Sequence, residues 1–305
     1  MLPGGIISIL TREMNETDLL RIRQLPCWRG GVRVAPLAGG MTNRNYVVLD
    51  DAGKHVVRLG EDVPHHHLLR WHELAVSQAA HAAGLSPAVE YAEPGALVME
   101  FLEARTLTPE EVRDPARTPA IVSLLKCCHR EVPRHLHGPT LTFWPFQVIR
   151  SYLARLRTRQ TSWSDRLEAF SRLNEELEKA LGAAPFAFGH NDLLAGNLLD
   201  DGQRLWLIDW DYAGYSTPLF DLANLATNNG ISGPSERALL EAYFEGSLDD
   251  SLLEGYHAMR VVSLLRETLW GMVSELYPAK EFDYATYTRE NLTRLEREIA
   301  QFRAR

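Results

Sequence analysis

The chain has 305 residues, of which 45% are hydrophobic and 24% are charged. It is long enough for two unequal domains, and its composition excludes a disordered chain and a small disulfide scaffold. Its formal net charge of −8 argues against nucleic acid as the main partner, because nucleic-acid-binding proteins usually present a basic face. A small cationic partner is compatible with this charge.

The cysteines and the hydropathy pattern bear on the compartment. Cys27, Cys127 and Cys128 have neither CxxC spacing nor an even count, so they predict reduced thiols. No apolar run reaches about 18 residues, and the N-terminus lacks a basic-then-apolar signal pattern. We therefore expect a cytoplasmic protein without a membrane partner. The sequence does not fix the oligomeric state, and a homodimer stays open.

The first third of the chain predicts a small sheet. A polar helix over Glu16–Arg23 precedes three strands at residues 32–37, 45–50 and 55–60. A helix is expected over residues 64–83, ended by Gly84 as its C-cap, with its histidines at 65–67 in solvent. Two more strands, around Pro94-Gly95, fill residues 90–103.

The first two strands are joined by a glycine-rich turn that contains Gly39, Gly40, Thr42 and Asn43. Glycines in such a turn let backbone N–H groups approach phosphate oxygens, and the two polar side chains add donors. Taken alone, a Gly-Gly turn is more often merely a turn.

After Leu102 the composition changes from strand to helix, which predicts an N-terminal domain over residues 1–102 and a C-terminal domain over residues 103–305. Helices are expected at residues 109–131, 146–157, 164–181 with Ser164 as N-cap, 235–245, 251–276 and 284–302.

The stretch FGHNDLLAGNLLDDGQRLWLIDWDYAG, residues 188–214, carries the chemistry. Asp201-Gly202 predicts a hairpin turn between strands 197–200 and 204–209. That hairpin brings Asn197 and Asp209 together near Asp192. Two carboxylates and a carboxamide supply the hard oxygen ligands that suit Mg²⁺, and a third carboxylate is left to serve as a base.

The order His-x-Asp, Asn five residues later, then a strand ending in Asp, is the phosphoryl-transfer layout of protein kinases. Here Asn191 replaces the usual Arg, and Trp210-Asp211 replaces Phe-Gly. The pattern is therefore kinase-like without being that of a protein kinase. The alternative, a polar loop beside an ordinary hairpin, requires four polar positions to match this spacing by accident.

The strings HNDLLAGN and IDWDYAG resemble the choline/ethanolamine kinase branch of the aminoglycoside phosphotransferase superfamily. GGMTNRNY resembles the nucleotide loop of that branch, and LWGMVSELYP with FDYATY resembles its carboxy-terminal part. The resemblance extends over residues 37–295. It implies an α+β, two-lobed protein-kinase-like fold with a small antiparallel-sheet N-lobe and a mainly helical C-lobe, and it implies ATP and Mg²⁺ as cofactors.

The resemblance also assigns roles to residues. Asp192 would be the catalytic base, His190 would brace its loop, and Asp221 would hold the loop through backbone contacts. The metal ligands would be Asn197, Asp209 and Asp211. The nucleotide would be bound by Gly39, Gly40, Thr42, Asn43, Arg58 paired with Glu73, and the hinge from Glu100 to Leu102.

In the same branch, aromatic residues of the carboxy-terminal part line the acceptor pocket. By that match the candidates here are Tyr212, Trp270, Phe282 and Tyr287, whose ring faces would attract a cationic ammonium. The sequence departs from the branch at Val273, where eukaryotic choline kinases carry a second Trp, and at Asn228-Asn229, where they carry an acidic residue and Trp.

The leading hypothesis from the sequence is an ATP-dependent kinase of choline or ethanolamine. An aminoglycoside, thiamine or another small alcohol is the alternative acceptor. A catalytically silent nucleotide-binding module is the alternative from another class, and the intact Asp192, Asn197 and Asp209 argue against it.

Overall fold

The computed structural model describes residues 15–37, 43–246, 248–278 and 282–305. Its contacts divide the chain into two units, residues 1–62 with 87–103, and residues 63–86 with 104–305. Strands dominate the first unit and helices dominate the second. The predicted α+β class, with a small antiparallel sheet and a mainly helical part, is confirmed. The predicted division into domains at residue 102 stays a prediction.

The first unit is a five-stranded antiparallel sheet in the order β1-β2-β3-β5-β4. Its strands are β1 (Arg33–Leu37), β2 (Arg44–Leu49), β3 (Lys54–Leu59), β4 (Val89–Glu93) and β5 (Ala96–Glu100). The helix α1 (Glu16–Arg23), capped by Asn15, contributes Ile22 to the same buried cluster as Val48, Val57 and Val98. The helix therefore packs against the sheet through Ile22.

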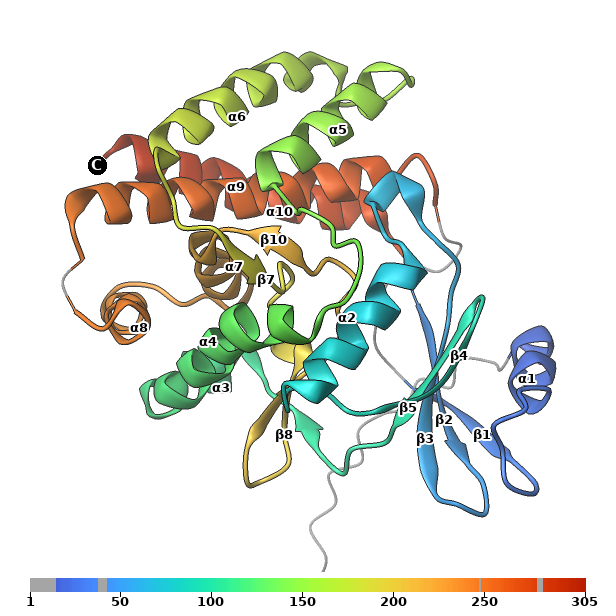
Figure 1. Cartoon of the computed structure of the whole chain (residues 1–305). Coiled ribbons are helices and arrows are strands. Elements are labelled where there is room, and N and C mark those ends of the chain that lie inside the picture. The colour runs from blue at the N-terminus through green and yellow to red at the C-terminus, as the bar shows by residue number, and fades with distance from the viewer. Residues whose placement is uncertain (1–14, 38–42, 247, 279–281) are drawn as a thin grey trace, which may run out of the picture. The chain divides into compact units, whose positions relative to one another are not determined.

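The second unit is built around a long buried helix. Its helices are α2 (Arg70–Ala82), α3 (Pro109–Arg113), α4 (Thr118–His135), α5 (Pro145–Arg157), α6 (Leu167–Leu181), α7 (Pro218–Asn229), α8 (Pro234–Phe244), α9 (Asp250–Ser274) and α10 (Tyr284–Arg303). Nearly every side chain of α9 from Gly255 to Ser274 is buried. Figure 1 shows α10 running beside α9, with α5 and α6 packed over the pair.

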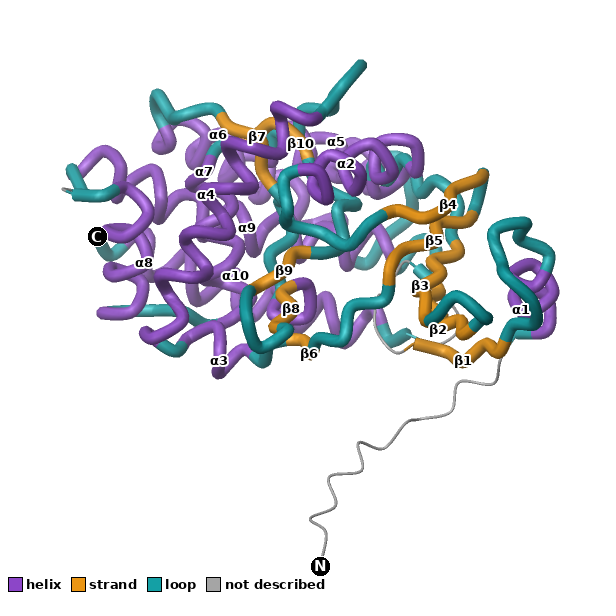
Figure 2. Tube along the Cα trace, turned by 60° about the horizontal axis from the view of Figure 1, so that its bottom comes forward, coloured by secondary structure: helices purple, strands orange, loops and turns teal. Residues whose placement is uncertain are grey.

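Short strands in the second unit position the chemistry. The hairpin of β8 (Leu198–Asp200) and β9 (Leu205–Leu207) pairs with β6 (Arg105–Thr106), and these three strands run side by side in Figure 2. A separate ribbon pairs β7 (Ala187–Gly189) with β10 (Gly214–Ser216). The predicted hairpin is confirmed. Its turn forms because Asp201 accepts hydrogen bonds from the N–H groups of residues 203 and 204.

Two helix starts were predicted wrongly. The segment from Pro64 forms a single 3-10 turn, and the chain turns at His67 with a φ of 64° before α2 begins at Arg70. Its His66 is not in solvent but buried. Ser164 likewise starts a 3-10 turn, and α6 begins at Leu167 without a side-chain cap. In both cases the polar or Pro start signal is real but belongs to a turn that precedes the α-helix.

The helix predicted over residues 109–131 is interrupted. Asp114 has extended backbone and caps the 3-10 turn at residues 115–117, so α3 ends before α4 begins at Thr118. Pro115 explains the break, because the residue before a proline disfavours helical backbone. No helix among the described residues is both long enough and apolar enough to cross a membrane.

Candidate active site

The loop that carries Asp192 is hydrogen-bonded to side chains of α7. The carboxylate of Asp221 accepts hydrogen bonds from the backbone N–H groups of His190 at 2.8 Å and Asn191 at 2.7 Å. Asp221 is thus the predicted brace of the loop. Asp221 does not cap α7, because Thr217 is its N-cap.

Two asparagines of α7 continue this support, and neither was predicted to contact the loop. Asn224 accepts from the N–H of Leu193 at 2.6 Å, and Asn229 accepts from the N–H of Ala195 at 2.9 Å. Asn229 also donates to the carbonyl of Leu193 at 3.1 Å. We call Asp221, Asn224 and Asn229 the α7 clamp. It fixes the backbone on both sides of Asp192.

Two histidines complete the support of the loop. His129 of α4 bonds Asp221 through Nε2 at 2.8 Å, so it supports the carboxylate that holds the loop. His190 is fully buried, meets the Ile208 carbonyl at 3.0 Å and accepts from the N–H of Asp192 at 3.3 Å. Burial lowers the pKa of His190, so the ring stays neutral. These contacts agree with a bracing function.

The hairpin delivers the candidate metal ligands to the loop. Asn197 donates from Nδ2 to the carbonyl of Asp192 at 2.9 Å, and its own carbonyl accepts from the N–H of Ile208 at 3.0 Å. Asp209 follows directly, with a φ of 71° that turns the chain at the end of β9. Because Nδ2 is used in this way, the amide oxygen Oδ1 of Asn197 is the end left for a ligand.

Among the described residues, no three His, Cys, Asp or Glu side chains are arranged to hold a metal ion. The candidate set is instead mixed, with one amide oxygen and the carboxylates of Asp209 and Asp211. Oxygen-only donors of this kind fit Mg²⁺, which takes one or two carboxylates and completes its shell with water and phosphate oxygens.

Arg70 of α2 bridges two of the predicted residues. Its Nη1 lies 2.8 Å from Asp211 Oδ1 and 2.6 Å from Glu73 Oε2, and both carboxylates are almost fully buried. Two residues along, His72 bonds the carbonyl of Ala213 at 3.0 Å. The first turn of α2 is thereby attached to residues 211–213. Spacing along the sequence gave no hint of this bridge.

Charges of both signs surround Asp192. Burial raises the pKa of its carboxyl to about 8, opposed by the guanidinium of Arg266 and reinforced by Glu267, Asp209 and Asp211. A carboxylic acid with a pKa near neutrality is suited to accept and return a proton. Burial thus favours the protonated carboxyl at neutral pH, and a cation beside Asp192 would favour the carboxylate.

The predicted acceptor-pocket aromatics form one cluster. Trp270 is 3% exposed and donates from Nε1 to the Tyr212 hydroxyl at 2.8 Å, and its ring lies 5.7 Å from that of Tyr287 in an edge-to-face arrangement. Phe282, at 39% exposure, packs on Tyr287 at 5.7 Å. Val273 is fully buried in the core of the unit.

Arg266 and Glu267 were missed in the sequence, although two adjacent charges within a largely apolar stretch of α9 could have signalled them. Arg266 Nη1 donates to Glu267 Oε2 at 2.6 Å, and the other oxygen of Glu267 accepts from the Tyr287 hydroxyl. The Arg266 guanidinium lies 4.2 Å from the centre of the Tyr212 ring. The guanidinium of Arg266 thus lies against Tyr212, one of the predicted acceptor-pocket aromatics.

His66 also belongs to the surroundings of Trp270. Its ring stacks on Trp270 at 4.8 Å, and its two nitrogens meet the hydroxyls of Tyr152 at 3.3 Å and Ser274 at 2.9 Å. Burial lowers its pKa to about 2. A neutral imidazole therefore supports one face of Trp270.

The predicted nucleotide residues are only partly described. Gly39, Gly40 and Thr42 lie outside the described residues. Asn43, just before β2, and Arg58, on β3, are buried in the first unit. Glu73 belongs to the second unit. The pairing of Arg58 with Glu73 stays a prediction.

At the predicted hinge, the N–H of Glu100 is donated to the Ala88 carbonyl at 2.9 Å. It is thus engaged within the sheet. Leu102 follows in the connection after β5. A contact of this segment with adenine stays a prediction.

A pocket of about 430 Å³ borders residues 211–213. Its walls come from the turn before α2, the start of α5 and residues 211–213, and they include Pro64, His67, Leu69, Leu141, Phe143, Trp144, Val148, Asp211 and Tyr212. Its volume is within the usual range for small-molecule sites, roughly 300–1,000 Å³.

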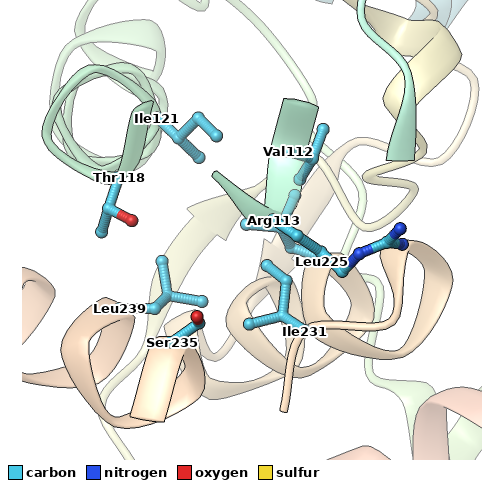
Figure 3. Close-up of a pocket in the computed structure, with 8 residues that line it drawn as sticks. All are labelled: Val112, Arg113, Thr118, Ile121, Leu225, Ile231, Ser235 and Leu239. Carbon is cyan, nitrogen blue, oxygen red and sulfur yellow. The ribbon is translucent and has the colours of Figure 1, made fainter. Parts of the chain in front are cut away.

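A second cavity is of a different kind. Figure 3 shows it among α3, α4, α7 and α8, lined by Val112, Arg113, Thr118, Ile121, Leu225, Ile231, Ser235 and Leu239. Its volume of about 10 Å³ is at the limit for one water molecule. We regard it as a packing gap beside the α7 clamp and not as a ligand site.

Comparison with known proteins gives this geometry a family. Protein LicA of Haemophilus influenzae is 29% identical over 216 residues, which cover 67% of this chain and 61% of that protein. A choline/ethanolamine kinase family protein from Mesorhizobium loti has a solved structure with 25% identity and a TM-score of 0.73, covering 95% of this chain and 99% of that one.

A solved structure of LicA in complex with AMP is 21% identical with a TM-score of 0.74 and covers 94% of this chain and 98% of that one. At this identity the likeness concerns the fold. The sequence pattern of the phosphotransferase enzyme family matches residues 33–262, more than half of the chain. Since that match spans the sheet, the loop of Asp192 and the hairpin, the chain belongs to the phosphotransferase enzyme family.

Proposed function

We propose that the protein transfers the γ-phosphoryl group of ATP to the hydroxyl of choline or ethanolamine. The observation that carries this proposal is the clamped loop of Asp192 with Asn197 bonded to its backbone and Asp209 at the end of the paired strand. The choline/ethanolamine kinase relationship of the Mesorhizobium loti protein supports the acceptor class.

In this mechanism Asp192 accepts the proton of the acceptor hydroxyl and orients its oxygen toward phosphorus. The α7 clamp holds Asp192 in place during the reaction, and His190 braces the loop without contacting the acceptor. Phosphoryl transfer depends on positioning and charge stabilisation more than on covalent chemistry, so these residues suffice.

Asn197, Asp209 and Asp211 would hold Mg²⁺, which when bound neutralises charge on the phosphate oxygens. Arg58, positioned by Glu73, would add a positive charge there. Gly39, Gly40, Thr42 and Asn43 would surround the phosphates, and the segment from Glu100 to Leu102 would meet the adenine. The AMP-bound LicA structure, which shares the fold, supports a nucleotide in this family of proteins.

The acceptor would lie against Tyr212, Trp270, Phe282 and Tyr287, with the carboxylate of Glu267 as an additional partner for its cationic end. An aminoglycoside, thiamine or another small alcohol is the second candidate acceptor. The cytoplasmic location and a homodimer stay predictions from the sequence.

The test of the mechanism is Asp192→Asn, with ADP release measured in the presence of choline or ethanolamine. Loss of the base should lower kcat by about 10²–10⁴-fold. Asp201→Asn, at the tip of the same hairpin, is the matched control and should keep its turnover, because its carboxylate only holds the turn. Wild-type turnover in Asp192→Asn would refute the assignment.

The test of the acceptor is a panel of choline, ethanolamine, thiamine and an aminoglycoside, compared by kcat/KM. Choline or ethanolamine should be the best acceptor. If neither is phosphorylated while another alcohol is, the reaction class stands and the proposed acceptor is wrong.

A further inference from the structure

Two buried arginines of α9 differ in how their hydrogen-bond donors are used. Arg260 has all three guanidinium nitrogens engaged, with Nε and Nη2 on Glu298 at 2.6 and 2.9 Å and Nη1 on Glu236 at 2.6 Å. This is the usual arrangement for an arginine in a protein interior, since each unmet donor is costly.

Arg266, six residues later, is 2% exposed but has a partner for Nη1 alone, the carboxylate of Glu267. Among the described residues, nothing accepts a hydrogen bond from its Nε or Nη2. The guanidinium is charged at any pH that proteins meet. A buried cation with two unmet donors calls for a further partner.

The two unmet donors are not scattered. Nε–H and one Nη2–H lie on the same edge of a guanidinium and point in parallel, which is the edge that binds carboxylate or phosphate through two hydrogen bonds. The plane of this edge is fixed, because the guanidinium is held at Nη1 by Glu267 and lies over the Tyr212 ring at 4.2 Å. The edge therefore presents the pair of parallel donors that an oxyanion requires.

Its location connects it with the reacting groups. Tyr212 follows Asp211 directly, Glu267 is bonded to Tyr287, and the charge of Arg266 acts on Asp192. The acceptor hydroxyl, once phosphorylated beside Asp192, carries a phosphate monoester with free oxygens. An acceptor that bears a carboxylate would bring an oxyanion to the same place.

We infer that the Nε–Nη2 edge of Arg266 is an oxyanion site in the acceptor pocket, which binds either the phosphate group of the product or a carboxylate on the acceptor. Its placement next to the acceptor rests on the proposed function, but its ability to bind an oxyanion does not. A phosphate and a carboxylate bind in the same way, because each offers two oxygens to the Nε–Nη2 edge of the guanidinium.

The experiment compares pairs of ligands that differ by one oxyanion. Binding of ethanolamine, O-phosphoethanolamine and L-serine to the full chain is measured by calorimetry with saturating AMP, so that phosphate binding at the nucleotide site does not contribute. The wild type should bind O-phosphoethanolamine or L-serine more tightly than ethanolamine. Tighter binding of the first alone identifies the product phosphate, and tighter binding of L-serine identifies an acceptor carboxylate.

Arg266→Met should weaken binding of the preferred oxyanion by about tenfold or more and affect ethanolamine less. Arg266→Lys keeps the charge and removes the fork, so it should lose most of the same gain. Arg260→Lys is the matched control on the same helix, and its oxyanion binding should equal that of the wild type in folded protein.

If neither oxyanion binds the wild type more tightly than ethanolamine, the inference is wrong, and this result needs no variant to fold. Equal losses in the Arg266→Lys and Arg260→Lys proteins would also overturn it. If choline and ethanolamine are not phosphorylated while oxyanion binding depends on Arg266, the proposed function fails and the oxyanion site stands.

Discussion

At the scale of single residues, buried titratable groups determine how the protein responds to pH. His66 shows this most simply, because it is 3% exposed and both ring nitrogens are bonded to hydroxyls. Burial lowers its pKa from 6.5 to about 2. In the unfolded chain the same ring takes up a proton near its ordinary pKa.

Stability should therefore fall on the acid side of pH 6.5. Above that pH neither state binds the proton, and below it only the unfolded chain does, until the folded pKa is reached. One group of this kind costs the folded state ~2 kcal/mol at pH 5. The wild type should lose unfolding free energy between pH 7.5 and pH 5, measured by urea denaturation. In His66→Gln this loss should be smaller by ~2 kcal/mol.

His137→Gln, at an exposed histidine, serves as the comparison and should keep the wild-type slope. An unchanged slope in His66→Gln would mean that another group takes up the proton.

At the scale of elements, α7 and the loop of Asp192 act as one piece. Three side chains of one helix bind the backbone of four loop residues, so the position of the base is set by a helix it does not belong to. Asp221 was expected from the family resemblance. Asn224 and Asn229 were not, because an asparagine in a helix has no spacing that reveals a backbone partner outside it.

Asn229→Ala should lower kcat by about tenfold or more, since the N–H of Ala195 and the carbonyl of Leu193 lose their partner and Asp192 is less well placed. The KM for ATP should change little. Steady-state kinetics with both substrates varied would check this split.

The neighbouring Asn228→Ala is the matched control, because no described partner meets the Nδ2 of Asn228. A rise in KM for ATP as large as the fall in kcat, or the same kcat loss in Asn228→Ala, would contradict the assigned positioning role.

At the scale of the whole molecule, the sequence predicted the class, most strands and the polar core of the site. The prediction worked where a signal is local, as in the hairpin turn at Asp201-Gly202 or the spacing of Asp192 and Asn197. It failed where partners are far apart in the chain, as with Arg70 on Asp211 or His66 under Trp270. Such pairs depend on packing, which no local pattern records.

The close approach of α9 and α10 offers a test of that packing. A Cβ added at Gly271 would lie 2.6 Å from Thr288 Oγ1 and 3.4 Å from its Cα, so Gly271→Ala must push α10 away. We expect a loss of about 1–3 kcal/mol in stability, seen as a lower thermal midpoint. A Cβ at Gly246 meets nothing within 4 Å, so Gly246→Ala should leave the free energy of unfolding within about 0.5 kcal/mol of wild type and the thermal midpoint nearly unchanged. Equal midpoints for the two variants would contradict this contact.

The same helix α9 supplies the interior of its unit and, through Arg266, Glu267 and Trp270, the wall of the proposed acceptor pocket. A substitution there that changes acceptor preference also changes a helix that is almost fully buried. Laboratory evolution of new acceptors should therefore succeed more often from a background that has first been stabilised elsewhere, because each useful change on this helix also weakens the fold.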